Sequence, residues 1–212
     1  MNKRLGTCFI ILGILLVIAS IGLAVMNVRT DQMAGEVSSH VLEELSIPVT
    51  EKIDNKPIIV GESIVVEEVP DYVLRPELEM PEQKVEEIPY IGALEIPALK
   101  LELPVIAATE YSYLRIAPCK LYGSAYLDNL VIGAHNYQTH FGKIKNLGYG
   151  DTVIFTDLDG NQFTYVVATI EILQPDQVEE MCSGEWPLTL YTCTLGGQSR
   201  ITVRCEYKKD HV

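Results

Sequence analysis

The sequence predicts an all-β domain of about 118 residues (90–207), a closed barrel or a sandwich, behind a membrane segment and an extended acidic spacer. Three observations support this prediction. An uncharged run of nineteen residues lies near the N-terminus, a stretch rich in acids and prolines follows it, and from residue 90 short β-prone runs alternate with turn signals. A chain of 212 residues is long enough for one such domain with appendages.

The apolar run extends from Cys8 to Met26 and is long enough to cross a bilayer core of roughly 30 Å. Lys3 and Arg4 precede it, and "LAVMNV" after it offers no convincing cleavage site for a signal peptidase. An uncleaved signal-anchor is therefore favoured over a cleaved signal peptide. The two bases place the N-terminus in the cytoplasm and the rest of the chain outside the cell membrane, which it crosses once, with residues 1–28 forming the tip and anchor.

Residues 29–89 read as an acidic, proline-containing spacer that holds a domain away from the membrane, although disordered filler would look the same. Fifteen acids face four bases between Asp31 and Glu87. "SSHVLEELS" could form one short helix, and "KPIIVGESIVVEEVP" one or two strands. The formal net charge of −13 makes nucleic acid an unexpected partner, since phosphates attract basic surfaces.

The domain over residues 90–207 is predicted element by element. "YIGALEIPALKLELPVI" gives two strands, "LVIGAH" a buried strand that ends at a histidine, and "THFGKIKNL" one short helix. "DTVIFTDLDGNQFTYVVATIEIL" is a hairpin, because Asp-Gly supplies the positive φ that a tight turn needs. "EWPLTLYTC" and "RITVRCEY" form the last pair of strands, and residues 208–212 are a polar tail.

The last hairpin brings a thiol beside a guanidinium. If Cys193 and Arg200 flank the loop 194–199, they are cross-strand partners with Cβ atoms about 4.5–5.5 Å apart. Arg204 lies about 13 Å further along the strand at about 3.3 Å per residue, so it is the weaker candidate. The alternation of side chains turns Cys205 toward the core.

A cation beside a thiol makes thiolate more available and can stabilise an oxyanion. A nucleophilic cysteine also needs a proton-transfer partner, usually histidine. Among the four histidines, His135 ends a strand and is favoured, whereas His140 begins the predicted helix, where a solvated or capping role is more usual. None of the five cysteines forms a CxxC pair, which gives zinc or thioredoxin-like chemistry little support.

Three separated stretches resemble the sortases, the cysteine transpeptidases of Gram-positive cell surfaces. "TLYTC" resembles the TLxTC signature of this family, "RITV" its following strand that begins with arginine, and "VIGAHN" its strand that ends at the active-site histidine. "IGALEIPALKLELPV" and "GDTVIFTDLDGNQFTYVV" resemble the opening strands and the middle hairpin. The resemblance covers about residues 90–207. Ala134 departs from the second glycine of many members, and we expect this difference to have little effect.

The resemblance implies an eight-stranded β-barrel in which Cys193 is the nucleophile, His135 the general acid/base and Arg200 the transition-state stabiliser, while Thr192 helps to hold the substrate. It implies cleavage of an LPxTG-like signal between Thr and Gly, with no metal and no organic cofactor. The implied partners are secreted proteins with a C-terminal sorting signal and an amine acceptor, either a peptidoglycan precursor or a pilin lysine. Within this resemblance, a single N-terminal anchor fits housekeeping and class D- or B-like enzymes.

Other readings stay open. Papain-like wall peptidases place Cys before His, whereas here His135 precedes Cys193 by 58 residues. L,D-transpeptidases carry an SHGC-like motif that this sequence lacks. A membrane-tethered binding module with an inert, buried Cys193 would need no catalysis at all, and a thiol-reactive probe separates it from an enzyme.

Overall fold

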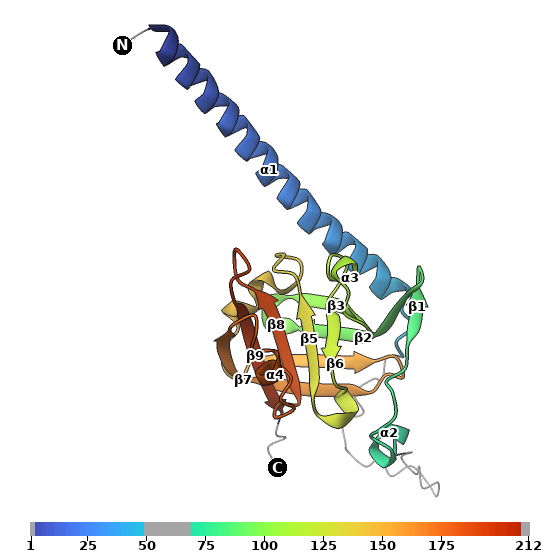
Figure 1. Cartoon of the computed structure of the whole chain (residues 1–212). Helices are drawn as coiled ribbons and strands as arrows, with labels where there is room; N and C mark the ends of the chain where they lie inside the picture. The colour runs from blue at the N-terminus through green and yellow to red at the C-terminus, as the bar shows by residue number, and fades with distance from the viewer. Residues whose placement is uncertain (1–2, 49–68, 209–212) are drawn as a thin grey trace, which may run out of the picture.

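The computed structural model describes residues 3–48 and 69–208, in which one long helix leads to a β-barrel (Figure 1). The helices are α1 (Lys3–Glu44), α2 (Asp71–Leu74), α3 (Tyr111–Leu114), α4 (Val178–Met181) and the 3₁₀ turns η1 (Pro97–Leu99), η2 (Ala125–Leu127) and η3 (Phe141–Asn146). The strands are β1 (Gln83–Val85), β2 (Ile88–Ile96), β3 (Leu101–Ile106), β4 (Cys119–Tyr122), β5 (Leu130–Ala134), β6 (Thr152–Asp157), β7 (Gln162–Leu173), β8 (Leu188–Cys193) and β9 (Arg200–Tyr207).

Eight strands close into a mixed barrel. They follow one another in the order β2-β3-β4-β5-β8-β9-β7-β6, and pairing of β2 with β6 completes the ring, while β1 adds to β2 as a short extra strand. The β3–β4 and β5–β8 pairs are parallel and the other pairs are antiparallel. The predicted closed eight-stranded barrel is therefore confirmed, as are the β6–β7 hairpin and a short helical segment, of 3₁₀ type, at η3.

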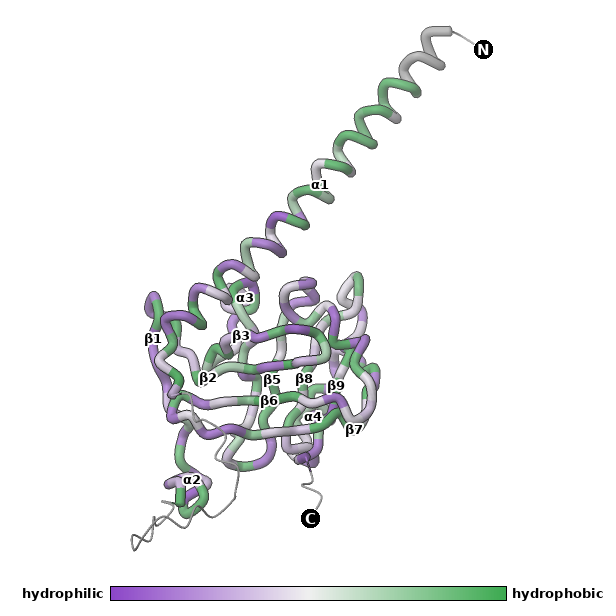
Figure 2. Tube along the Cα trace, turned by 180° about the vertical axis from the view of Figure 1, so that it is seen from behind, coloured by the Kyte–Doolittle hydropathy of each residue, from purple (hydrophilic) through white to green (hydrophobic). Residues whose placement is uncertain are grey.

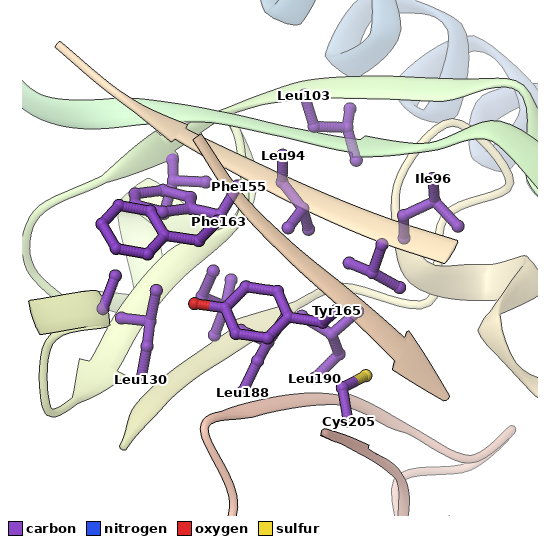
Figure 3. Close-up of a cluster of buried hydrophobic side chains, with 14 of the residues drawn as sticks. Leu94, Ile96, Leu103, Leu130, Phe155, Phe163, Tyr165, Leu188, Leu190 and Cys205 are labelled. Atoms are coloured by element: carbon purple, nitrogen blue, oxygen red, sulfur yellow. The ribbon is translucent and has the colours of Figure 1, made fainter. Parts of the chain in front are cut away.

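The barrel interior is filled largely by alternate residues of the barrel strands other than β4 (Figure 3). On β8 and β9 the inward side chains include Leu188, Leu190, Val203 and Cys205, all fully buried. The core position predicted for Cys205 is thus confirmed. Full burial of a large aliphatic or aromatic side chain contributes about 1.5–3 kcal/mol, so this interior holds the strand ends in fixed relative positions.

Helix α1 corrects the prediction for the spacer. The chain does not become extended after residue 28, because α1, which is 42 residues long, continues to Glu44 and includes most of the short helix expected in "SSHVLEELS". Its last turns pack on the barrel, where Ala34, Val41 and Leu45 are buried. Within the rest of the spacer, α2 and β1 are regular elements, and the strands expected in "KPIIVGESIVVEEVP" lie almost wholly outside the described residues.

The two halves of α1 differ in character (Figure 2). Its N-terminal half is mostly hydrophobic and projects away from the barrel, whereas the half next to the barrel is largely hydrophilic. Within the described residues, α1 is long and apolar enough to cross a membrane, and its most apolar window has no residue buried against the barrel. The length and composition fit a membrane anchor or a signal segment.

Candidate active site

Two parallel strands end side by side and carry the predicted histidine and cysteine. In the β5–β8 pair Ala134 lies opposite Thr192, His135 follows directly after β5, and Cys193 is the last residue of β8. Because neighbouring strands lie about 4.8 Å apart and parallel strands end at the same edge, the imidazole and the thiol belong to the same end of the barrel.

The third predicted residue joins them through the β8–β9 hairpin. Cys193 and Arg200 are directly opposed in the antiparallel register, as the sequence predicts. The connecting loop is closed by the Thr194 amide, which donates to the Ser199 carbonyl at 2.9 Å, and by the Gly197 amide, which donates to the Thr194 carbonyl at 2.8 Å. This turn fixes which residue faces Cys193.

The alternation of side chains places all three residues on the outer face of the barrel. Leu190 and Ala134 point inward, to the core cluster, so Tyr191 and Gly133 point outward. Continuing the alternation by two residues puts Cys193 and His135 on the same outer face. Cys193, His135 and Arg200 are each partly exposed. They can therefore meet a substrate from outside, unlike the fully buried Cys119 and Cys205.

A close approach below the site explains the glycine of "VIGAH". A Cβ atom at Gly133 would lie 2.3 Å from the ring of Tyr191, which is shorter than side chains tolerate. Tyr191 therefore lies across the backbone of β5 immediately beneath the histidine and the cysteine. A larger residue at position 133 would displace the Tyr191 ring.

Thr192 is less accessible than a substrate-holding residue is expected to be. Its side chain is 1% exposed, and its hydroxyl donates to the Ala134 carbonyl at 2.8 Å. This bond ties the end of β8 to the end of β5, one residue before both Cys193 and His135. The role of Thr192 in holding substrate stays a prediction, and its observed contact fixes the relative position of the two strands.

His135 is surrounded by residues that sequence reasoning did not select. Its ring centroid lies 5.0 Å from that of Tyr137 and 5.8 Å from that of Tyr111, and the Arg115 guanidinium lies 5.7 Å from the Tyr111 ring. Burial lowers the pKa of His135 and the charge of Arg115 lowers it further, and both effects favour the neutral imidazole. No motif marks Tyr111 or Arg115, because α3 comes to the site only in the folded barrel.

His140 has a different environment from the one expected. The sequence predicts a solvated or capping histidine, but the side chain is completely buried and makes no capping bond to η3. Its Nε2 atom lies 3.4 Å from the hydroxyl of Ser38, a buried residue of α1. The docking of α1 therefore buries His140, which the local sequence does not indicate.

Burial makes His140 a source of pH-dependent stability. It lowers the pKa of His140 from about 6.5 to about 4, so the unfolded chain takes up a proton at a higher pH than the native protein. This stability is complete above pH 6.5 and is lost as the pH falls toward 4. We expect the free energy of unfolding to fall by about 2 kcal/mol from pH 7 to pH 5. In urea titrations His140→Gln should remove most of this decrease, and a His140→Gln variant with the same pH dependence as the wild type would contradict the assignment.

The two arginines of β9 have separate tasks. Arg200 is partly exposed, and its Nη1 donates to the carbonyls of Gly197 and Ser199 at 3.1 and 3.2 Å. Since a guanidinium has five N–H donors, others are left to face a ligand. Arg204 lies opposite Thr189, four positions away from the Cys193 pair, as predicted. It is 3% exposed, so it is a buried structural residue.

All three guanidinium nitrogens of Arg204 donate hydrogen bonds to groups of the protein itself. Its guanidinium donates to the Glu171 carboxylate at 2.7 Å, to the carbonyls of Met181 and Glu180 at 2.9 Å each, and to the Thr189 hydroxyl at 3.1 Å. These bonds hold the segment around α4 against the outside of β8 and β9. Removal of the guanidinium would leave the buried acceptors of Met181 and Thr189 without their donor, which costs about 1–3 kcal/mol for each group.

Lysine substitutions separate the two arginines. Arg200→Lys should lower turnover by about 10²–10³-fold, because an ammonium cannot reproduce the planar fork of donors. Arg204→Lys should leave the turnover of folded protein within about twofold of wild type but lower the free energy of unfolding by about 2–4 kcal/mol. Steady-state kinetics and urea unfolding of both variants test this. A larger loss of turnover in Arg204→Lys than in Arg200→Lys would contradict the roles assigned to the two arginines.

Comparison with known proteins identifies the family of the barrel. A family model described as a sortase domain matches residues 94–208, more than half of the chain. The sortase C1 structure from Streptococcus suis is 27% identical with a TM-score of 0.50, and the match covers 58% of this chain and 75% of that one. Sortase C of Streptococcus pneumoniae is 25% identical with a TM-score of 0.50, covering 61% and 73%.

More distant similarity extends to another class. A sortase D5 transpeptidase from Clostridium perfringens is 20% identical with a TM-score of 0.50 over 57% of this chain and 79% of that one, and it shows the same fold. A search of curated protein sequences gives no match. The neighbours span class C and class D and leave the subclass undetermined. From the family match over the barrel, this chain belongs to the sortase family, the cysteine transpeptidases that act on sorting signals.

Proposed function

We propose that this protein cleaves an LPxTG-like C-terminal sorting signal between Thr and Gly, through a thioacyl-enzyme at Cys193, and transfers the protein to an amine. The observation that carries the proposal is the convergence of Cys193, His135 and Arg200 on one outer face at one end of the barrel. A thiol, a neutral imidazole and a guanidinium together supply the nucleophile, the proton carrier and the oxyanion donor that acyl transfer requires.

In the first step the Cys193 thiolate attacks the carbonyl carbon of the signal threonine. The negative charge that develops on the carbonyl oxygen is stabilised by N–H donors of Arg200. The Thr–Gly bond then breaks, and the departing glycine amine receives its proton from His135. His135 obtains this proton from the Cys193 thiol, which becomes the attacking thiolate, and then passes it to the departing amine.

In the second step an amine attacks the thioester. His135 removes the proton of the incoming nitrogen, the new amide bond forms, and the Cys193 thiolate leaves. No electron is gained or lost and no cofactor takes part. The acceptor is an amine of the cell wall or of a pilin. The pilin option is supported by the similar sortase C of Streptococcus pneumoniae, whose structure provides insights into pilin substrate specificity.

The proposed location is the cell membrane, with α1 as a single-pass anchor, its N-terminus in the cytoplasm and the barrel outside. The apolar N-terminal half of α1 and the preceding Lys3 and Arg4 support this orientation. Both substrates of the reaction are then available at the same surface, since sorting signals emerge there after secretion.

Incubation of the protein with a library of sorting-signal peptides, with and without an added amine, tests the proposed function. Mass spectrometry should find cleavage before glycine and, with the amine present, a ligated product. Hydrolysis at unrelated bonds would indicate a different peptidase. If the chain were instead a binding module with an inert cysteine, a thiol probe would label Cys193 only after unfolding, whereas the partial exposure of this residue predicts labelling of the native protein.

A further inference from the structure

Helix α1 binds the loop that follows the proposed catalytic histidine. The Asp31 carboxylate accepts hydrogen bonds from the backbone amides of Gln138 and Thr139, both at 3.0 Å, and from the Thr139 hydroxyl at 2.6 Å. The same hydroxyl also lies 2.9 Å from the Asp31 carbonyl oxygen. One carboxylate thus satisfies three donors of a single loop, with charge-assisted bonds that are about twice as strong as neutral ones.

The next two turns of α1 continue this contact. Gly35 lies against Thr139, and a Cβ atom at this position would be only 2.9 Å from the Thr139 methyl group. Ser38 donates to the Ile116 carbonyl at 3.2 Å and touches His140. Asp31, Gly35 and Ser38 are spaced by four and three residues, so they share one face of the helix. One face of the helix therefore packs against the barrel over several turns, and the Asp31 bonds are part of this larger contact.

Further along, the same face of α1 enters a second hydrophobic cluster. Val41 and Leu45 are buried there with Tyr90, Ile106 and Cys119 of the barrel wall. This apolar contact fixes the helix independently of the polar contacts at Asp31. The carboxylate is then presented to the loop from a rigid support.

The loop connects this support to His135. The Phe141 amide donates to the His135 carbonyl at 3.2 Å and closes the loop at its base. Within the loop, the amides of His140 and Gly142 both donate to the Tyr137 carbonyl, at 3.0 and 2.8 Å, and the Tyr137 ring lies against the His135 ring. A displacement of Gln138 and Thr139 therefore moves Tyr137, and with it one wall of the imidazole site.

We propose that Asp31 is a positioning residue for His135, and that the anchor helix thereby forms part of the scaffold of the active site. Asp31 does not touch the reacting atoms, and it acts by fixing the loop between His135 and Phe141. The proposal rests on the proposed function of His135 as the acid/base. It assigns a role to a residue of the segment that the sequence presents as a mere spacer.

The position of Asp31 along α1 has a consequence for the membrane. The apolar run ends at Met26, five residues earlier, which is about 7.5 Å along the helix at about 1.5 Å per residue. The end of the barrel with the active site faces the apolar half of α1 (Figure 1). The same bonds that place His135 thus hold the catalytic end close to the membrane surface, in place of a flexible tether.

The test uses the full chain in detergent micelles and compares Asp31→Ala with Glu36→Gln, which changes an exposed carboxylate of the same helix. Asp31→Ala should lower kcat for a sorting-signal peptide by about 10–100-fold, the effect of a small misplacement of a catalytic group, with KM within about twofold. Asp31→Asn, which keeps the shape and one acceptor oxygen, should recover part of kcat. Glu36→Gln should match wild type.

A second readout does not depend on activity. The NMR signal of the His135 ring should shift in Asp31→Ala and not in Glu36→Gln. If the wild type cleaves no peptide but this signal shifts, the proposed function fails while the positioning holds. If the wild type is active and Asp31→Ala equals Glu36→Gln in kcat and in the His135 signal, the positioning proposal is overturned.

A partner variant guards against misfolding of Asp31→Ala. Thr139→Val removes the hydroxyl donor but leaves the two amide bonds, so it should lower kcat by a smaller factor and shift the same His135 signal. Because the two residues share one contact, the double variant should be no slower than Asp31→Ala alone. Full additivity of the two effects on kcat would count against a common mechanism.

Discussion

Replacement of Cys193 by alanine is expected to reduce cleavage of a sorting-signal peptide to the background rate. A methyl group cannot form the thioester, and neither the imidazole nor the guanidinium at this end of the barrel can replace the nucleophile. The fold should persist, because Cys193 is only partly buried and its backbone pairing with Arg200 does not depend on the side chain. Product analysis by chromatography, together with circular dichroism, measures both expectations.

The other cysteines provide the controls for this result. Cys182 is also partly exposed, and Cys182→Ala should retain both activity and fold. Cys119 and Cys205 are fully buried, so their alanine variants should lower stability and leave the turnover of folded protein near the wild-type value. Cleavage by Cys193→Ala at close to the wild-type rate would mean that the nucleophile is elsewhere.

The second large effect is expected at His135. His135→Ala should lower kcat by at least about 10²–10⁴-fold, the usual contribution of general acid–base catalysis, since this one imidazole serves both steps. The free energy of unfolding of His135→Ala should be close to that of the wild type, because the ring is only partly buried. Single-turnover measurement of acylation and of amine transfer should find both steps slowed.

His140→Ala is the matched comparison and should show the opposite pattern. Its side chain is completely buried against α1, so truncation leaves a cavity and costs stability, while the turnover of protein that remains folded stays closer to wild type. Activities must therefore be divided by the folded fraction from the urea curve. A greater loss of kcat at His140 than at His135 would reverse the assignment of the acid/base.

Much of the site could be predicted from local sequence because it is built from local rules. The β8–β9 hairpin has a short loop, so counting residues from the turn places Arg200 opposite Cys193 and Arg204 four positions away. The period of two then turns Cys205 inward. Each of these predictions depends on strand geometry alone, and the structure confirms each one.

The prediction of an extended spacer was wrong for the residues that follow the apolar run and precede "SSHVLEELS", because the helical signal there is weak. Ala34, Ser38, Val41 and Leu45 recur on one helix face, but two of these four are small and the segment between them is acidic. Such a face has little apolar surface and resembles a solvated stretch. The helix nevertheless packs on the barrel, because Thr139 and Ile116, which are distant in sequence, supply hydrogen-bond partners for Asp31 and Ser38.

The sequence by itself determined the all-β character of the domain and the hairpin register, since these follow from alternation and turn chemistry, and its motifs selected Cys193, His135 and Arg200 as candidate site residues. Only the tertiary structure decided that Arg204 and His140 are buried and that Asp31 binds the loop that follows His135. The physical reason is that burial depends on which distant segment covers a side chain. Ser38 and His140 are 102 residues apart in the sequence, so a local sequence pattern cannot predict their contact.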